Sequence, residues 1–120
     1  MIAPPAGVQI WLVAGATDMR RGFDGLAAII AQQLHQDPFG GALFLFRGRR
    51  GHLVKILFWD GQGLVLYAKR LERGHFVWPA TRDGAISLTP AQLSMLTEGI
   101  DWRMPARTTE GRLPQPERAG

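Results

Sequence analysis

Positive charge is the feature of this sequence with the clearest chemical use, and it is concentrated in one stretch. Residues 47–75 hold seven Lys and Arg residues against two acidic residues, a local balance of 7 − 2 = +5, whereas the whole chain has a net charge of +4. Such a stretch is typical of proteins with an anionic partner such as nucleic acid. The cations expected to contact phosphates are Arg49, Arg50, Lys55, Lys69, Arg70 and Arg73. Solubility alone would also explain the charge.

Three aromatic residues lie between or beside these cations, namely Tyr67, Phe76 and Trp78. Proteins that bind nucleic acid on a sheet surface use cations to follow the phosphates and aromatic rings to stack on the bases. We therefore interpret these three side chains as candidate stacking residues. The alternative is a solvated sheet edge whose aromatic side chains lie in the core.

The carboxylates do not show the pattern of a nuclease or transposase, which needs two or three of them to hold a pair of Mg²⁺ ions about 3.5–4 Å apart. Asp18, Asp24 and Asp60 are the best placed, but each has a structural role available at a helix start or in a turn. The histidines match no metal-ligand spacing. We therefore predict a protein that is not an enzyme, with no catalytic residue, metal or cofactor. A nuclease is the least favoured alternative, after a nucleic-acid-binding protein and a protein–protein adaptor.

The first third of the chain predicts a strand followed by a long helix. Residues 8–13 are mostly apolar and lie between glycines, as in a buried strand. Residues 23–36 carry apolar side chains at helical spacing, which predicts one stripe facing a core. The stripe consists of Phe23, Leu26, Ala27, Ile30, Ala31 and Leu34. Proline and glycine at residues 38–41 are expected to end the helix.

The middle of the chain predicts strands joined by short turns, at residues 42–47, 53–59, 64–71 and 75–78. Because consecutive strands with short connections usually pair, we expect an antiparallel arrangement. A four-residue turn at 60–63 pairs Lys55 with Ala68. This register brings Arg49 and Arg50 to the same end of the hairpin as residues 69–73.

These elements predict an α+β fold: a small twisted antiparallel sheet of about four or five strands, one long helix packed on one face, and a short C-terminal helix starting at Thr89-Pro90. The other face, or the end with the arginines, would meet the partner. We expect a single domain over residues 1–103 and a flexible basic, proline-rich tail at 104–120. With no cysteine, no signal-peptide pattern and no membrane-spanning apolar run, we expect a cytoplasmic protein.

Several strings of residues carry more information than composition does. They are TDMRRGFDGL at 17–26, FLFR at 44–47, KILFWDGQG at 55–63 and KRLERGHFVWP at 69–79. Together with residues 88–102, these strings resemble, in the same order, the motifs of the TnpB-type accessory protein of the IS66 family of bacterial insertion sequences. The resemblance covers about residues 8–102.

The resemblance implies a non-catalytic accessory factor for DNA transposition, while a separate, larger transposase carries out catalysis. The expected partners are that transposase, other proteins of the same element and DNA, with no membrane. We predict that the protein binds nucleic acid through its basic sheet surface. The alternative is a protein–protein adaptor that docks on the transposase without direct DNA contact.

Six residues within the matching strings are expected to have structural roles: Asp18, Arg20, Asp24, Trp59, Asp60 and Gly61. Asp18 would pair with Arg20 or cap the helix, and either would fix the connection between strand and helix. Trp59 would be a core residue at the start of a hairpin turn. Cations within an apolar strand are costly unless they are exposed or paired. The leading functional residues are therefore Lys69, Arg70, Phe76 and Trp78.

Overall fold

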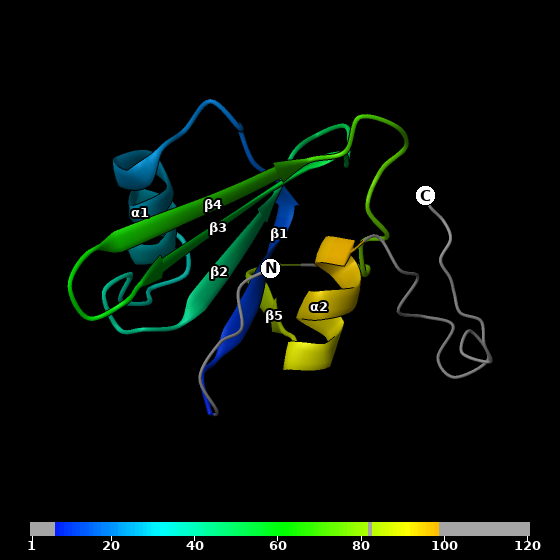
Figure 1. The fold of residues 1–120 in the computed structure, drawn as a ribbon. Helices are drawn as coiled ribbons and strands as arrows, with labels where there is room; N and C mark the ends of the chain where they lie inside the picture. The colour runs from blue at the N-terminus through cyan, green and yellow to red at the C-terminus, as the bar shows by residue number, and fades with distance from the viewer. Residues whose placement is uncertain (1–6, 82, 99–120) are drawn as a thin grey trace.

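The computed structural model describes residues 7–81 and 83–98, and it has the α+β composition that the sequence predicts. The elements in chain order are β1 (Ile10–Ala16), α1 (Phe23–Gln32), β2 (Leu43–Arg47), β3 (Leu53–Trp59), β4 (Leu64–Arg70), β5 (Ala85–Ser87) and α2 (Pro90–Glu98). The strands form one sheet in the order β4-β3-β2-β1-β5 (Figure 1). Within the described residues, no helix is long and apolar enough to cross a membrane.

The sheet is mixed, so the prediction of a wholly antiparallel sheet is wrong at one pair of strands. β1 and β2 run parallel, with Ile10 opposite Leu43, while the other neighbouring strands are antiparallel. The connection from β1 to β2 is long and contains α1, which is the kind of crossover that parallel neighbours need. Among the described strands, short turns join only β2 to β3 and β3 to β4.

α1 is also shorter than predicted, because regular helix ends at Gln32 and not at residue 36. The chain leaves the helix through His35, whose φ of 55° is left-handed. The N–H of Gln36 then donates to the carbonyl of Ile30 at 3.1 Å. A left-handed residue of this kind commonly closes a helix, so the predicted apolar stripe runs past the last regular turn.

Residues 75–78 do not form the predicted strand. They lie outside regular secondary structure, and the N–H of Phe76 donates to the carbonyl of Gly51 at 2.9 Å. The fifth strand is β5, which pairs antiparallel with β1. β5 has three residues, which is too few for an alternating pattern to be recognised in the sequence.

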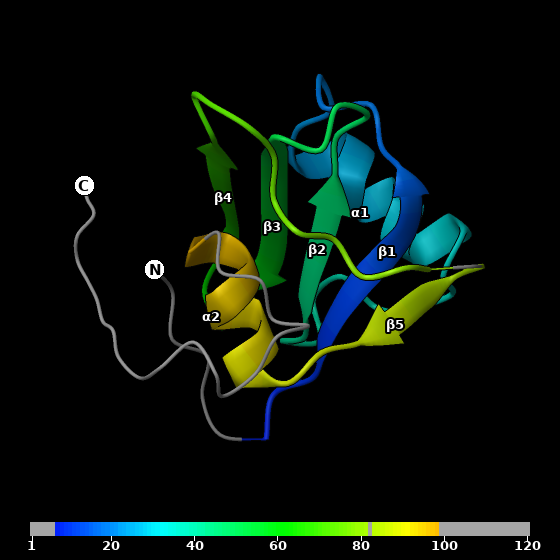
Figure 2. The same cartoon turned by 90° about the vertical axis from the view of Figure 1, so that its right-hand side faces the viewer.

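The sheet has a small core on each face, and each core lies under one helix (Figure 2). Successive residues of β3 supply both cores, because side chains alternate along a strand. Leu57 packs with Leu26 and Ile30 of α1, whereas Ile56 packs with Leu93 of α2. Burial of such a side chain contributes about 1.5–3 kcal/mol.

α2 covers the face that the sequence left open for a partner. The helix begins with a capping box: the N–H of Gln92 donates to Thr89 Oγ1 at 3.0 Å, and the N–H of Thr89 donates to Gln92 Oε1 at 2.9 Å. Of the two predicted partner surfaces, the second face therefore carries α2, and the end of the sheet is the accessible basic surface. The predicted domain end at residue 103 and the predicted tail at 104–120 lie outside the described residues.

Candidate nucleic-acid interface

Three segments that are distant in the sequence meet at one end of the sheet. The tips of β1, β2 and β4 all point to this end, where β3 begins (Figure 2). The register places Ala16 opposite Arg47 and Leu53 opposite Arg70. The second pair brings the turn with Arg49 and Arg50 to the same end of the hairpin as residues 69–73, as the sequence predicts. We call this surface the basic end and define it as residues 16–22, 47–53 and 70–78.

All nine Lys and Arg residues of the described part of the chain lie in the basic end or on the two strands next to it. They are Arg20, Arg21, Arg47, Arg49, Arg50, Lys55, Lys69, Arg70 and Arg73. The opposite end of the sheet carries the β3–β4 turn with its carboxylate, Asp60. The described part of the molecule therefore has a strong asymmetry of charge along the strands, which favours orientation of an anionic partner toward one end.

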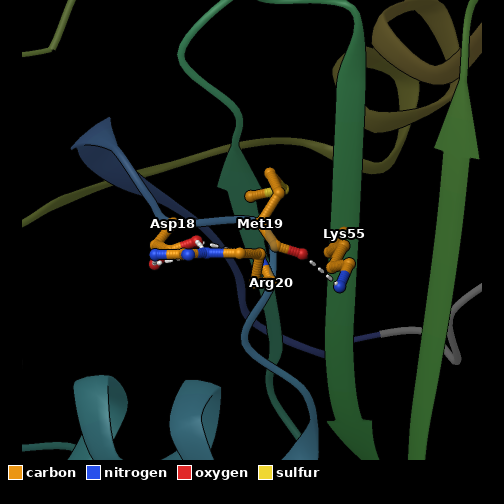
Figure 3. A network of polar contacts seen from close by, with 4 residues as sticks. All are labelled: Asp18, Met19, Arg20 and Lys55. Carbon is orange, nitrogen blue, oxygen red and sulfur yellow. Dashed lines mark hydrogen bonds and ion pairs between the residues drawn. The ribbon is translucent and has the colours of Figure 1, made fainter.

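The two lysines of this set are engaged within the protein. Lys55 Nζ donates to the carbonyl oxygen of Met19 at 2.7 Å (Figure 3). It also donates to the carbonyl oxygen of Arg21 at 3.0 Å, and so ties the β1–α1 connection to β3. Lys69 Nζ donates to the carbonyl of Thr97 at 2.7 Å. That carbonyl lies in the last turn of α2, where carbonyls lack helical partners and a cation is favourable. Both lysines thus hold neighbouring elements in place.

Asp18 and Arg20 form the charged pair that the sequence suggested. Arg20 donates through Nε and Nη2 to the carboxylate, with a shortest distance of 2.7 Å, and its backbone N–H donates to Asp18 Oδ1 at 3.0 Å (Figure 3). These hydrogen bonds hold the pKa of Asp18 far below its usual range. Asp18 does not cap α1, because the N-cap residue is Gly22 and no side chain bonds there.

Arg49 and Arg50 occupy the turn between β2 and β3, and both are exposed. Within the described residues, neither has a salt bridge. The glycines on each side let this turn pack closely: a Cβ on Gly48 would come within 2.9 Å of Met19 Cγ, and a Cβ on Gly51 within 3.3 Å of Trp78 Nε1. The two arginines are therefore presented by a turn that is packed on both sides.

A hollow lies on each side of this turn. The larger, of about 570 Å³, is a cleft between residues 16–20 and residues 48–53. The smaller, of about 360 Å³, lies between the turn and residues 75–78. Arg49 and Arg50 line both hollows.

The aromatic candidates turn out to be mostly structural. Phe76 has no exposed surface, so its interpretation as a stacking residue is wrong. Trp78 is half-buried; its Nε1 donates to the carbonyl of Gly51 at 2.9 Å, and its ring meets Phe76 edge-on at 5.7 Å. Tyr67 is also partly buried and packs against the α2-side core. Phe76 and Trp78 both border the smaller hollow of the basic end, and of these two Trp78 has exposed surface.

The other charged candidates divide between surface pairs and turns. Arg70 forms a surface salt bridge of 3.1 Å with Glu72, and Arg73 is exposed with no salt bridge among the described residues. Asp24 is exposed in the first turn of α1. No group of three or more histidine or acidic side chains in the described residues is arranged to hold a metal ion.

The β3–β4 turn has the structure that its sequence predicts. Asp60 Oδ1 accepts from the N–H groups of Gln62 and Gly63, both at 2.9 Å, and Gly61 has a left-handed φ of 100°. These hydrogen bonds lower the pKa of Asp60. Trp59 is only partly buried and meets the ring of Phe39 edge-on at 5.7 Å.

Comparison with known proteins places the chain in a family. The model of the IS66 Orf2-like protein family matches residues 8–107. The chain belongs to this family. Two proteins of Sinorhizobium fredii are also similar. Uncharacterized protein y4hO is 50% identical over 108 residues, which cover 90% of this chain and 94% of that protein. Uncharacterized protein y4jC is 39% identical over 102 residues, which cover 85% of this chain and 87% of that protein. No solved structure matches.

Membership of the IS66 Orf2-like family gives the protein an accessory role associated with transposition and with the transposase of the element. The motif strings now have physical explanations. The first four residues of the string at 17–26 line the larger cleft and contain the charged pair, and the string at 55–63 forms most of β3 and the Asp60 turn.

The residues that sequence reasoning missed are those that shape the larger cleft, namely Met19, His52 and Leu53. In the sequence of this IS66 Orf2-like protein, Met19 lies within the string at 17–26, and the signal for His52 and Leu53 is the pair of glycines that brackets Arg49 and Arg50. Paired glycines indicate a turn, but they do not reveal which distant segment will pack against it.

Proposed function

We propose that this protein assists transposition of its insertion sequence by binding DNA through the basic end. The proposal is carried by one observation: Arg49 and Arg50 project from a tightly packed turn, exposed and without salt bridges among the described residues. Arginine held in this way binds phosphate well, because its planar guanidinium donates two parallel hydrogen bonds and loses little freedom on binding.

The surrounding charges support the same proposal. Arg73 is exposed beside the turn, and Arg70 can exchange its surface salt bridge for a phosphate at small cost, since such bridges contribute about 0–1 kcal/mol. Lys55 and Lys69 act indirectly: Lys55 fixes the β1–α1 connection beside the turn, and Lys69 holds the end of α2. In this proposal the chain supplies no catalytic group, and catalysis belongs to the transposase.

A DNA-binding titration tests the proposal. Fluorescence anisotropy with labelled DNA from the ends of the element, at low salt, should show binding that weakens steeply as salt is added, because bound cations release counterions from DNA. Replacement of both turn arginines (Arg49→Ala with Arg50→Ala) should weaken binding about tenfold or more. If the wild-type protein binds neither duplex nor single strands at low salt, DNA binding is ruled out.

A matched control separates a local contact from a change in net charge. Gln32→Glu with Ala91→Glu lowers the net charge by the same two units, at exposed positions of α1 and α2 outside the basic end. This control should retain nearly all of the wild-type affinity. Equal weakening by both double variants would mean that only the total charge matters.

A second candidate function, docking on the transposase, is favoured by a different surface. Phe23 and Phe39 are the large apolar side chains most exposed in the described residues, at 48% and 53%. β4 is also an edge strand of the sheet, and such edges can pair with a strand of another protein. Co-purification with the transposase after nuclease treatment, lost in Phe39→Ser but kept in the double arginine variant, would favour this adaptor role.

A further inference from the structure

We infer that the basic end takes an unpaired strand of DNA in preference to a duplex, with phosphates on Arg49 and Arg50 and one base in the larger cleft. This inference rests on the proposed DNA binding and adds the form of DNA. It comes from the shape of the surface, because the two arginines form a ridge between two hollows.

The larger cleft has the size and lining for a base. Its volume of about 570 Å³ lies in the range of pockets that enclose small organic ligands, about 300–1,000 Å³. Met19 and Leu53 give it apolar surface, while His52 supplies a ring nitrogen that can form a hydrogen bond with a base edge. A base within a duplex is stacked and paired, so it can enter such a pocket only after it is flipped out of the helix.

The charges around the cleft favour a phosphate at its rim. Asp18 is the acidic residue in the lining, and its carboxylate is already bound by Arg20. The cleft therefore presents the arginines of the turn without an opposing free carboxylate. Lys55 holds the carbonyl of Met19, which fixes the apolar wall before any ligand arrives.

The smaller hollow extends the site to a neighbouring nucleotide. It shares Arg49 and Arg50 with the cleft and is bordered by the half-buried ring of Trp78. A strand that crosses the ridge can therefore place one base on each side while its phosphates stay on the arginines. Single-strand binding proteins likewise combine cations that follow the backbone with aromatic rings on which bases stack, and Trp78 offers such a ring here. A duplex would contact the ridge and leave both hollows empty.

A cleft-filling variant tests this inference without removing any charge. Ala16 is exposed at the end of β1 and lines the larger cleft, so the indole of Ala16→Trp should occupy the space of the base. The control is Ala31→Trp, at an exposed position of α1 that does not line the cleft. Each protein is titrated with a labelled single strand and with its duplex of equal length, and circular dichroism checks that both variants fold.

The wild-type protein should bind the single strand about tenfold more tightly than the duplex, since a base stacked on an aromatic ring such as Trp78 contributes about five- to a hundredfold in affinity. Ala16→Trp should weaken binding of the single strand and so reduce this preference, whereas Ala31→Trp should behave like the wild type. Equal binding of the two forms, or an unchanged preference in Ala16→Trp, would overturn the inference and leave the proposed DNA binding intact. Tighter binding of RNA of the same sequence would overturn the assignment to DNA, and absence of all binding would remove the proposed function itself.

Discussion

Side chains from residues 47–76 form two sets that face in opposite directions in the fold. Lys55, Lys69 and Phe76 turn inward, where the lysines bind backbone carbonyls and the ring fills a core. Arg49 and Arg50 turn outward on a packed turn. The comparison shows that a dense run of cations can be part scaffold and part surface. For these cations the division follows element type, because the two lysines lie on strands and reach neighbouring segments, whereas the two arginines project from a turn at the end of the sheet.

The largest effect on stability should come from replacement of the buried ring of Phe76. Phe76→Ala should lower the free energy of unfolding by about 3–5 kcal/mol, because it leaves a cavity beneath α2 and the 71–78 segment. Urea denaturation followed by circular dichroism measures this loss. A change below 1 kcal/mol would mean that Phe76 is not part of the core.

The inward lysine of β3 should have the next largest effect. Lys55→Met keeps the length of the side chain but removes both hydrogen bonds to the β1–α1 connection, so we expect a loss of about 2–3 kcal/mol in unfolding free energy. Arg49→Ala with Arg50→Ala is the outward counterpart and should change stability by less than about 0.5 kcal/mol. The division between the two sets fails if the arginine variant is the less stable of the two.

Lys69→Met should have a smaller effect, of about 1–2 kcal/mol, because a single hydrogen bond to the end of α2 is lost. Hydrogen exchange should locate this loss in α2, with faster exchange of its amides and little change in β3. Uniformly faster exchange over the whole sheet would contradict the assigned role of Lys69.

Asp18 offers the smallest and most specific change. Its pKa is lowered by the hydrogen bonds from Arg20, so the pair adds stability above the pKa of the unfolded chain and loses it as the pH falls. The difference in stability between the wild type and Asp18→Asn should therefore be constant above about pH 5 and shrink below about pH 4. A difference that grows toward acid pH would contradict this sign.

The same variant also tests whether Arg20, once released from its pair, binds DNA as the exposed turn arginines are proposed to do. Asp18→Asn frees Arg20 at the rim of the cleft, so DNA affinity at neutral pH should rise a few-fold. Fluorescence anisotropy measures it. A fall in affinity would indicate that the pair itself, and not the free arginine, contacts DNA.

The sequence predicted those features that depend on local patterns. The α+β class, the pairing of Lys55 with Ala68, the Asp60 turn and the cap at Thr89 all follow from neighbours in the chain. The parallel pairing of β1 with β2, the early end of α1 and the cover supplied by α2 depend on long-range packing, which local patterns do not contain.

The candidate site shows the same limit. Its location at one end of the hairpin could be predicted, because antiparallel register determines which residues share an end. The inward direction of the Lys55 side chain could not be predicted, since its acceptors are carbonyls of residues that lie more than thirty positions away in the sequence. The same holds for the cleft, whose two walls come from separate segments.

The central claim is that the turn arginines, and not the strand lysines, contact DNA phosphates. The most direct test is the slope of log affinity against log salt concentration for the wild type, for Arg49→Ala with Arg50→Ala, and for Lys69→Met. Each lost phosphate contact reduces this slope by about 0.7–0.9, so the arginine variant should lose about 1.5 and Lys69→Met should match the wild type. An unchanged slope in the arginine variant, or an equal reduction in Lys69→Met, would contradict the account.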